Sequence, residues 1–259
     1  MIVRTFESAD QAAVALADRV KEAIARKPDL VLGLPAGRSP VGAYAALRRL
    51  YGQGQVDFSR VTTFNLDEFA GIDSGHPGSF RRFMEEHLFG GVNANPARVR
   101  FLDGAAADLD AECDRYEAAI ERAGGIDLQI VGIGANGHVG FNEPGDTLVA
   151  RTHRVALHEV TRRENAALFG GNPSGVPREA LSMGMGTILR AAEIVLIATG
   201  ERKARCIERT VRGPLTTRLP ASFLQTHRQV ELFIDRAAAA LLRGGPEGPP
   251  TTAPRPRDR

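Results

Sequence analysis

The chain has 259 residues, of which 33 are lysine or arginine and 31 are aspartate or glutamate. This length suffices for one large α/β domain with a sizeable apolar core. The near balance of charges, without a basic stripe interleaved with aromatic residues, argues against a nucleic-acid partner. No apolar run is long enough to span a bilayer and the N-terminus lacks a signal-peptide pattern, so we expect no membrane association.

Two cysteines, Cys113 and Cys206, lie far apart in the sequence and lack the spacing of metal ligands. Both fall within helical patterns, which is typical of free thiols in a reducing compartment. The histidines show no HxxxH-type pairing with carboxylates, so we expect no metal site. These features predict a cytoplasmic protein.

Strand-like and helix-like segments alternate from the start of the chain. We expect strands at residues 2–6, 30–34, 61–66, 99–102, 126–133, 154–157, 194–198 and 229–234. Helices are expected between them, among others at residues 40–51, 79–88 and 108–123. The alternation predicts an α/β fold with a mostly parallel, doubly wound (Rossmann-like) sheet and helices on both faces. We expect one domain at residues 1–243 and a disordered tail rich in Pro, Gly and Arg at 244–259.

The turn that follows the strand at residues 30–34 has the features of a phosphate site. Its members Ala36, Gly37, Arg38 and Ser39 precede Pro40, which is well placed to start a helix. A glycine-containing turn at a helix N-terminus offers free N–H groups to an anion, and Arg38 and Ser39 add side-chain donors. An ordinary capping turn is the alternative interpretation.

Two adjacent acids, Asp67 and Glu68, end the next apolar strand. Neighbouring side chains on a strand point to opposite sides, so one acid can face a cleft while the other is anchored elsewhere. Burial of an unpaired charge is expensive, which argues against a role in the core alone. From the residues alone either acid is a candidate general base, and a solvated loop entry is the alternative.

A glycine-rich loop at residues 132–144 follows a buried strand and carries His138 and Glu143. Glycines let the backbone approach a ligand closely, and loops at the carboxyl ends of strands bind ligands in open α/β sheets. Lys203 stands where a helix begins after the strand at 194–198, and a bound phosphate would offset its unfavourable interaction with the helix dipole. Together these four segments predict proton transfers on a phosphorylated small molecule. The alternative for the loop at 132–144 is a tight turn with a solvated histidine, and the alternative for Lys203 is a solvated lysine.

With these segments, the chain resembles the glucosamine-6-phosphate deaminase (glucosamine-6-phosphate isomerase) family. The similar segments extend over roughly residues 1–240 and follow one another in the same order as in the family. The matching blocks are residues 32–40, 64–69, 76–80, 132–144, 176–181, 184–187, 200–203 and 220–222. The ending Phe-Asn-Glu-Pro at 141–144 is specific to the deaminases, whereas the related 6-phosphogluconolactonases differ after the histidine. The resemblance implies isomerisation and deamination of glucosamine 6-phosphate to fructose 6-phosphate and ammonia, with no metal or organic cofactor.

The resemblance also implies roles for individual residues. Asp67 would move a proton between C2 and C1, with Glu68 as a neighbouring support, and His138 would assist ring opening while Glu143 holds its imidazole. Ser39, Lys203 and the turn amides at 36–38 would bind the phosphate, and residues 158–171 would form a mobile helical lid.

Three positions depart from the family pattern. Asn136 stands where many members carry an aspartate of the His–carboxylate cluster, so we expect a lower pKa or another tautomer for His138. The lid arginine used on phosphate aligns with Ala167, for which Arg38 or Arg163 could compensate; we favour Arg38. The basic pair of the allosteric site for N-acetylglucosamine 6-phosphate falls on His153 and Val155, so we expect no activation by that compound.

Other functions remain open at this level. These are deamination of another amino-sugar phosphate such as galactosamine 6-phosphate, a 6-phosphogluconolactonase-like hydrolysis, and a non-catalytic sugar-phosphate-binding regulator. Retention of Asp67 and Glu143 argues against the lactonase, whereas Asn136 and Ala167 keep the regulator in consideration. The expected partner is a small sugar phosphate, and the protein is either a monomer or a homo-oligomer.

Overall fold

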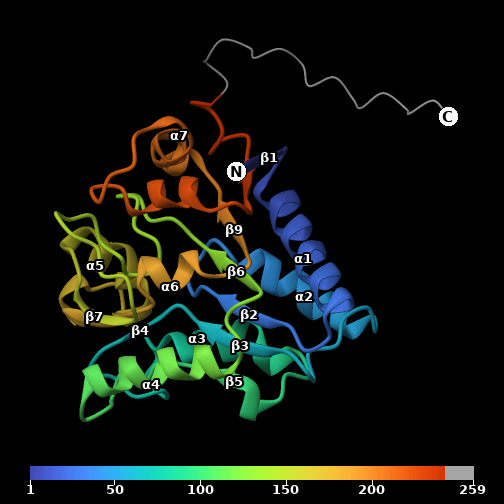
Figure 1. Cartoon of the computed structure of the whole chain (residues 1–259), viewed down its shortest axis with the longest axis horizontal. Coiled ribbons are helices and arrows are strands. Elements are labelled where there is room, and N and C mark those ends of the chain that lie inside the picture. The colour runs from blue at the N-terminus through green and yellow to red at the C-terminus, as the bar shows by residue number, and fades with distance from the viewer. Residues whose placement is uncertain (243–259) are drawn as a thin grey trace.

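The computed structural model describes residues 1–242 (Figure 1). The predicted tail at 244–259 therefore lies outside the described residues. Within residues 1–242 no helix is long and apolar enough to cross a membrane.

Seven parallel strands form the main sheet, as the alternating pattern predicted. Their order is β1 (Ile2–Phe6), β10 (Val230–Asp235), β9 (Glu193–Ala198), β6 (Leu128–Val131), β2 (Val31–Leu34), β3 (Thr62–Asn65) and β5 (Val99–Arg100). Every strand coincides with a predicted one, but the strands predicted at 126–133 and 99–102 are shorter than expected. The central strands β2 and β6 are buried throughout, in agreement with their continuous apolar sequence.

Helices cover both faces of this sheet (Figure 1). Helices α1 (Ala9–Arg26), α2 (Val41–Gly52) and α3 (Phe80–His87) pack on one face around a cluster that includes Leu32 and Leu47. Helices α4 (Leu109–Arg122), α6 (Met185–Leu189) and α7 (Ala204–Arg212) pack on the other face. The sheet with helices on both faces confirms the predicted fold class.

A second, three-stranded antiparallel sheet was not predicted. It consists of β4 (Asp67–Phe69), β8 (Glu179–Ser182) and β7 (His153–Ala156), with β8 in the middle. The chain leaves the main sheet after Asn65 and joins this sheet at Asp67. Strands of three or four residues are too short to show a clear periodicity, which explains why β4 and β8 escaped prediction.

The predicted lid segment, residues 158–171, contains α5 (Glu159–Asn165) and a 3-10 helix at Ala166–Phe169. The Phe169 ring packs edge-on against Phe69 at a centroid distance of 5.1 Å and lies over Gly78, where a Cβ atom would clash with it. The segment is thus seated on the small sheet and on the loop before α3. Its mobility stays a prediction.

The strand order reverses between β2 and β6. From β2 the chain proceeds to β3 on one side, whereas from β6 it proceeds to β9 and β10 on the other. Open parallel sheets form a crevice at such a switch point, beyond the carboxyl ends of the strands. The loops after β2 and β6, both singled out from the sequence, meet there.

A buried carboxylate on α4 links this helix to the residue before β7 and to α6. Glu117 is 1 % exposed and accepts hydrogen bonds from the backbone and side chain of Thr152, both at 2.7 Å, and from Thr187. Arg190 adds an ion pair at 3.0 Å. Burial raises the pKa of Glu117, but the hydrogen bonds and the charge of Arg190 outweigh it and leave the pKa below its ordinary value. Ionised Glu117 therefore stabilises the fold.

We predict that Glu117→Gln lowers the free energy of unfolding at pH 7 by about 2 kcal/mol, the usual range for hydrogen bonds to a charged group. Because the pKa of Glu117 is lower in the folded state, its contribution is present above the unfolded pKa and is lost as the pH falls through the folded value. The difference from wild type in urea unfolding should shrink below about pH 4.5. Glu121→Gln is the matched control, because Glu121 is 63 % exposed on the same helix; equal effects of the two substitutions would contradict the prediction.

Candidate active site

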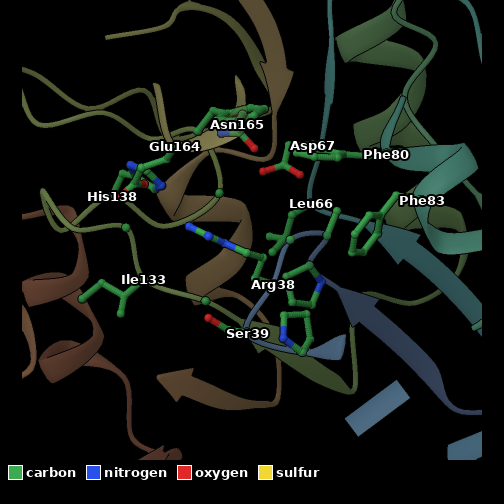
Figure 2. A pocket seen from close by; sticks show the side chains of 18 of the residues that line it. Arg38, Ser39, Leu66, Asp67, Phe80, Phe83, Ile133, His138, Glu164 and Asn165 are labelled. Atoms are coloured by element: carbon green, nitrogen blue, oxygen red, sulfur yellow. The ribbon is translucent and has the colours of Figure 1, made fainter. Parts of the chain in front are cut away.

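A cavity of about 210 Å³ lies at the switch point of the sheet. Six segments surround it: the turn after β2, the start of β4, α3, the loop after β6, the lid segment and the turn that leads into α7 (Figure 2). It brings together charged and hydrogen-bonding side chains from distant parts of the sequence, namely Arg38, Ser39, Asp67, His138, Glu164, Asn165 and Lys203. A small, partly open cavity with a few convergent polar groups suits a small metabolite.

The turn after β2 forms one wall of the cavity with Ala36, Gly37, Arg38 and Ser39. Gly37 has a φ of 102°, which favours glycine at this position. Within residues 1–242 the backbone N–H groups of these four residues donate no hydrogen bond, so they are available to an anion. The Arg38 side chain extends into the cavity (Figure 2). The turn predicted to bind phosphate therefore has free donors.

Lys203 lines the same wall at the end of a 3-10 turn (Glu201–Lys203) that leads into α7. Burial is the main cause that lowers its pKa, and the nearby charges of Arg38 and Arg202 lower it further. Among the described residues no carboxylate lies within 4.0 Å of its ammonium group. A phosphate placed between Lys203 and the turn would compensate both burial and the helix dipole.

Asp67 faces the cavity from the start of β4 and is 6 % exposed. Burial, together with the charge of Glu68, raises the pKa of its carboxyl to about 8. A carboxyl group with a pKa near the working pH can both take up and return a proton. Figure 2 shows Asp67 across the cavity from His138.

Glu68 points away from this cavity and is not among the residues that line it. Its carboxylate accepts hydrogen bonds from Ser79 Oγ at 2.7 Å and from the backbone N–H groups of Phe69, Phe80 and Arg81 at 2.9–3.0 Å. Glu68 therefore does not contact a ligand in this cavity, and its role as a neighbouring support of Asp67 stays a prediction. Alternation along β4 turns one acid into the cavity and attaches the other to the start of α3.

His138 lies at the cavity with its ring directly over Gly134. A Cβ atom on Gly134 would come within 2.2 Å of the His138 ring. The Nδ1 atom is 3.7 Å from Glu143 Oε2 and 3.4 Å from Thr161 Oγ1. Burial is the main cause that lowers the pKa of His138, with Glu143 acting in the opposite direction. The lower pKa agrees with the expectation, although its first cause is burial rather than Asn136.

Asn136 does not line the cavity but connects the parts of the histidine loop. Its Nδ2 group donates to Glu143 Oε2 at 2.9 Å, and its Oδ1 accepts from the His138 backbone at 3.1 Å. Glu143, whose side chain is 5 % exposed, also accepts from the His158 backbone at 3.1 Å. Asn136 and Glu143 thus hold the loop in shape around His138.

Arg163 does not reach the cavity. Its side chain is 65 % exposed and pairs with Glu159 on the outer face of α5. Arg163 and Ala167 are four residues apart and would share one face of a continuous α-helix. However, α5 ends at Asn165 and a 3-10 helix follows, which turns Ala167 to a different side. Ala167 lines the cavity while Arg163 does not, so the expected compensation from Arg163 is wrong.

Several lining residues were not anticipated. Phe80, Phe83, Phe141 and Leu168 form apolar walls, and Glu164 adds a second acid to the cavity besides Asp67. The sequence contained no signal for Glu164, because its position depends on how α5 packs. Within residues 1–242 no group of three or more His, Cys, Asp or Glu side chains could hold a metal ion.

The fold and the cavity define a class: an α/β protein that binds a small phosphorylated compound at the sheet switch point and has acid–base groups beside it. Residues 4–233 match the family model described as glucosamine-6-phosphate isomerases/6-phosphogluconolactonase. The chain belongs to this family.

Two curated relatives share about half of their residues with this chain. A glucosamine-6-phosphate deaminase of Halothermothrix orenii is 52% identical over 216 residues, which are 83% of this chain and 89% of that protein. Glucosamine-6-phosphate deaminase 2 of Bacillus subtilis is 50% identical over 225 residues, 86% of this chain and 90% of that protein. A solved structure of a monomeric glucosamine-6-phosphate deaminase is 40% identical, with a TM-score of 0.90 over 93% of this chain and 100% of that one.

We predict that Gly134→Ala lowers kcat by at least tenfold, because a methyl group at this position displaces the His138 ring. Gly52→Ala is the control, since a Cβ atom there would meet nothing within 4 Å and Gly52 lies outside the cavity. The measurement is steady-state turnover, with near-ultraviolet circular dichroism to establish that both variants are folded. Equal turnover of the two variants would contradict the placement of the ring.

Proposed function

We propose that this protein converts glucosamine 6-phosphate and water to fructose 6-phosphate and ammonia. One observation carries the proposal: a single cavity joins free phosphate donors, a buried Asp67 with a raised pKa, and His138. The deaminases to which the chain is similar support this choice of substrate.

The phosphate is bound at the wall formed by the turn after β2 and Lys203. The turn with its free amides, Ser39, Arg38 and Lys203 all line this wall. Bound phosphate places the sugar between Asp67 and His138, away from the positive end of the cavity. Because the sugar is held beside both groups, proton transfers between the sugar and Asp67 or His138 take place within one complex.

Ring opening is the first step. The C1–O5 bond breaks, its electron pair stays on O5, and O5 takes a proton from His138 while the O1 hydroxyl releases its proton to form the aldehyde. Glu143 and Asn136 hold the loop that aims the imidazole. His138 is then reprotonated from the O1 proton, so no net charge accumulates.

Isomerisation and release of ammonia follow. Asp67 takes the proton from C2, the C2–H electron pair forms a C1–C2 double bond, and O1 takes a proton from water, which the proton released in the later hydrolysis of the iminium group replaces. The same carboxyl returns the proton to C1, which leaves an iminium group at C2. Water adds to this group and ammonia leaves, which gives the ketone. The chemistry is an isomerisation joined to a hydrolytic deamination.

The proposal extends to assembly and location. The similarity to a monomeric deaminase supports a monomer. His153 and Val155 stand where the family has the basic pair of its allosteric site, which supports the absence of activation by N-acetylglucosamine 6-phosphate. Cytoplasmic location remains the expectation from the sequence.

The decisive experiment measures ammonia and fructose 6-phosphate formed from glucosamine 6-phosphate by wild type and by Asp67→Asn. We expect wild-type turnover and a loss of at least a hundredfold in the variant, as for removal of a general base. Absence of wild-type turnover, with fructose 6-phosphate still bound, would favour the regulator. Turnover that survives in the variant would remove Asp67 from its role.

Thermal unfolding of the same variant provides the check on folding. The folded-state pKa of Asp67, about 8, lies above its unfolded value, so ionisation destabilises the wild type increasingly between about pH 4 and pH 8. Asp67→Asn should therefore be more stable than wild type at pH 8 and gain little at pH 4. A folded-state pKa even one unit above the unfolded value costs about 1.4 kcal/mol, which is roughly 3–6 °C in Tm.

Arg38→Ala tests the phosphate wall. Loss of a charge-assisted hydrogen bond worth about 1.5–3 kcal/mol should raise KM about tenfold or more with kcat changed little. Arg163→Ala is the matched control, because Arg163 is exposed and outside the cavity. An unchanged KM in Arg38→Ala, or a larger rise in Arg163→Ala, would reject the assignment to Arg38.

A further inference from the structure

The lid segment contributes a carboxylate to the cavity that the proposed reaction does not use. Glu164 lies in the last turn of α5 and lines the cavity together with Asn165, Ala167 and Leu168. Figure 2 shows Glu164 next to His138, on the side of the cavity opposite Phe80 and Phe83. It forms no ion pair within 4.0 Å in the part of the chain that the structure describes.

Contacts of α5 hold Glu164 at this place. The Arg162 guanidinium donates to the carbonyls of Pro173 and Val176, at 2.9 and 3.2 Å. Asn165 Nδ2 donates to the Thr161 carbonyl at 2.9 Å, and Thr161 is itself fully buried beside His138. The carboxylate of Glu164 therefore faces the cavity only when α5 is packed on the protein.

Charged groups from four segments act on His138. Glu143 belongs to its own loop, His158 precedes α5, Glu164 lies on α5, and Lys203 precedes α7. Burial lowers the pKa of His138, Glu143 and Glu164 raise it, and Lys203 and His158 lower it. Arg38 is a further cation in the cavity. The two carboxylates are thus the groups that favour an imidazolium in this site.

The loop around His138 contributes only one of these carboxylates. Position 136 is an amide, which hydrogen-bonds Glu143 but carries no charge. Glu164 is the acid from outside this loop that lines the same cavity beside the ring.

We propose that Glu164 is a positioning residue that stabilises protonated His138 from the lid segment, so that packing of α5 prepares the histidine to donate its proton to the sugar ring. The proposal rests on the role of His138 in the proposed function. It goes beyond that role because it assigns the supporting charge to the lid, and it makes His138 protonation depend on the position of α5.

The direct test is the titration of His138 in the ligand-free protein, followed by NMR of ¹³C-labelled histidine Cε1–H groups. The His138 signal is assigned by its absence from a His138→Gln variant. In Glu164→Gln we expect the protonated fraction of His138 at pH 6.5 to fall about threefold or more. Glu164→Asp should give an intermediate value, and Glu159→Gln should match wild type because Glu159 is exposed on the same helix.

This titration needs no turnover, so its outcome is independent of whether the deaminase reaction is found. An unchanged His138 titration in Glu164→Gln would overturn the proposal even in an active enzyme. A titration that shifts in all three variants alike would also overturn it, because it would indicate a general disturbance of α5.

Kinetics give the second test. If Glu164 acts through His138, Glu164→Gln lowers kcat about threefold or more on the alkaline side of the pH profile, changes KM less than twofold, and approaches wild type at low pH. Glu164 also acts on Lys203. A lower KM with unchanged kcat, together with tighter inhibition by inorganic phosphate, would instead make Glu164 a competitor of phosphate and reject the proposal.

Discussion

Three hydrogen bonds attach the Glu68 carboxylate to Ser79 and to the backbone at the start of α3, a fourth comes from the Phe69 N–H group, and the geometry of the cavity depends on them. Because neighbouring side chains on a strand face opposite sides, anchoring Glu68 fixes Asp67 toward the cavity. The same carboxylate, together with burial, raises the pKa of Asp67. One anchored residue thus determines both where the base lies and how readily it holds a proton.

The cavity gathers groups that are unfavourable in the absence of a ligand. Asp67 is buried and Lys203 is a partly buried cation, and the pKa of each is shifted toward its neutral form, chiefly by burial. The amides of the turn after β2 have no hydrogen-bond acceptor among the described residues. Such sites reduce stability locally, and networks elsewhere, such as the one around Glu117, offset that cost. A phosphorylated ligand supplies the missing negative charge and acceptors.

The lid segment links binding to acid–base chemistry through packing. Its aromatic residue Phe169 lies against Phe69 and over Gly78, close to the helix that Glu68 anchors. The same segment brings Thr161 and Glu164 to His138. Contacts of the lid with the body of the protein therefore place charge beside the histidine as well as covering the cavity.

The sequence by itself determined the parallel sheet, because short apolar strands alternate with amphipathic helices. It also located the turn after β2, the histidine loop and Lys203 near strand ends. Alternation along a strand also indicated that only one of Asp67 and Glu68 faces a cleft. Only the tertiary structure decided the rest. The three-residue strand β4 and the end of α5 at Asn165 are set by contacts with distant segments, which local patterns do not encode. For that reason Arg163 points to solvent and Glu164 to the cavity, although they are adjacent in the chain.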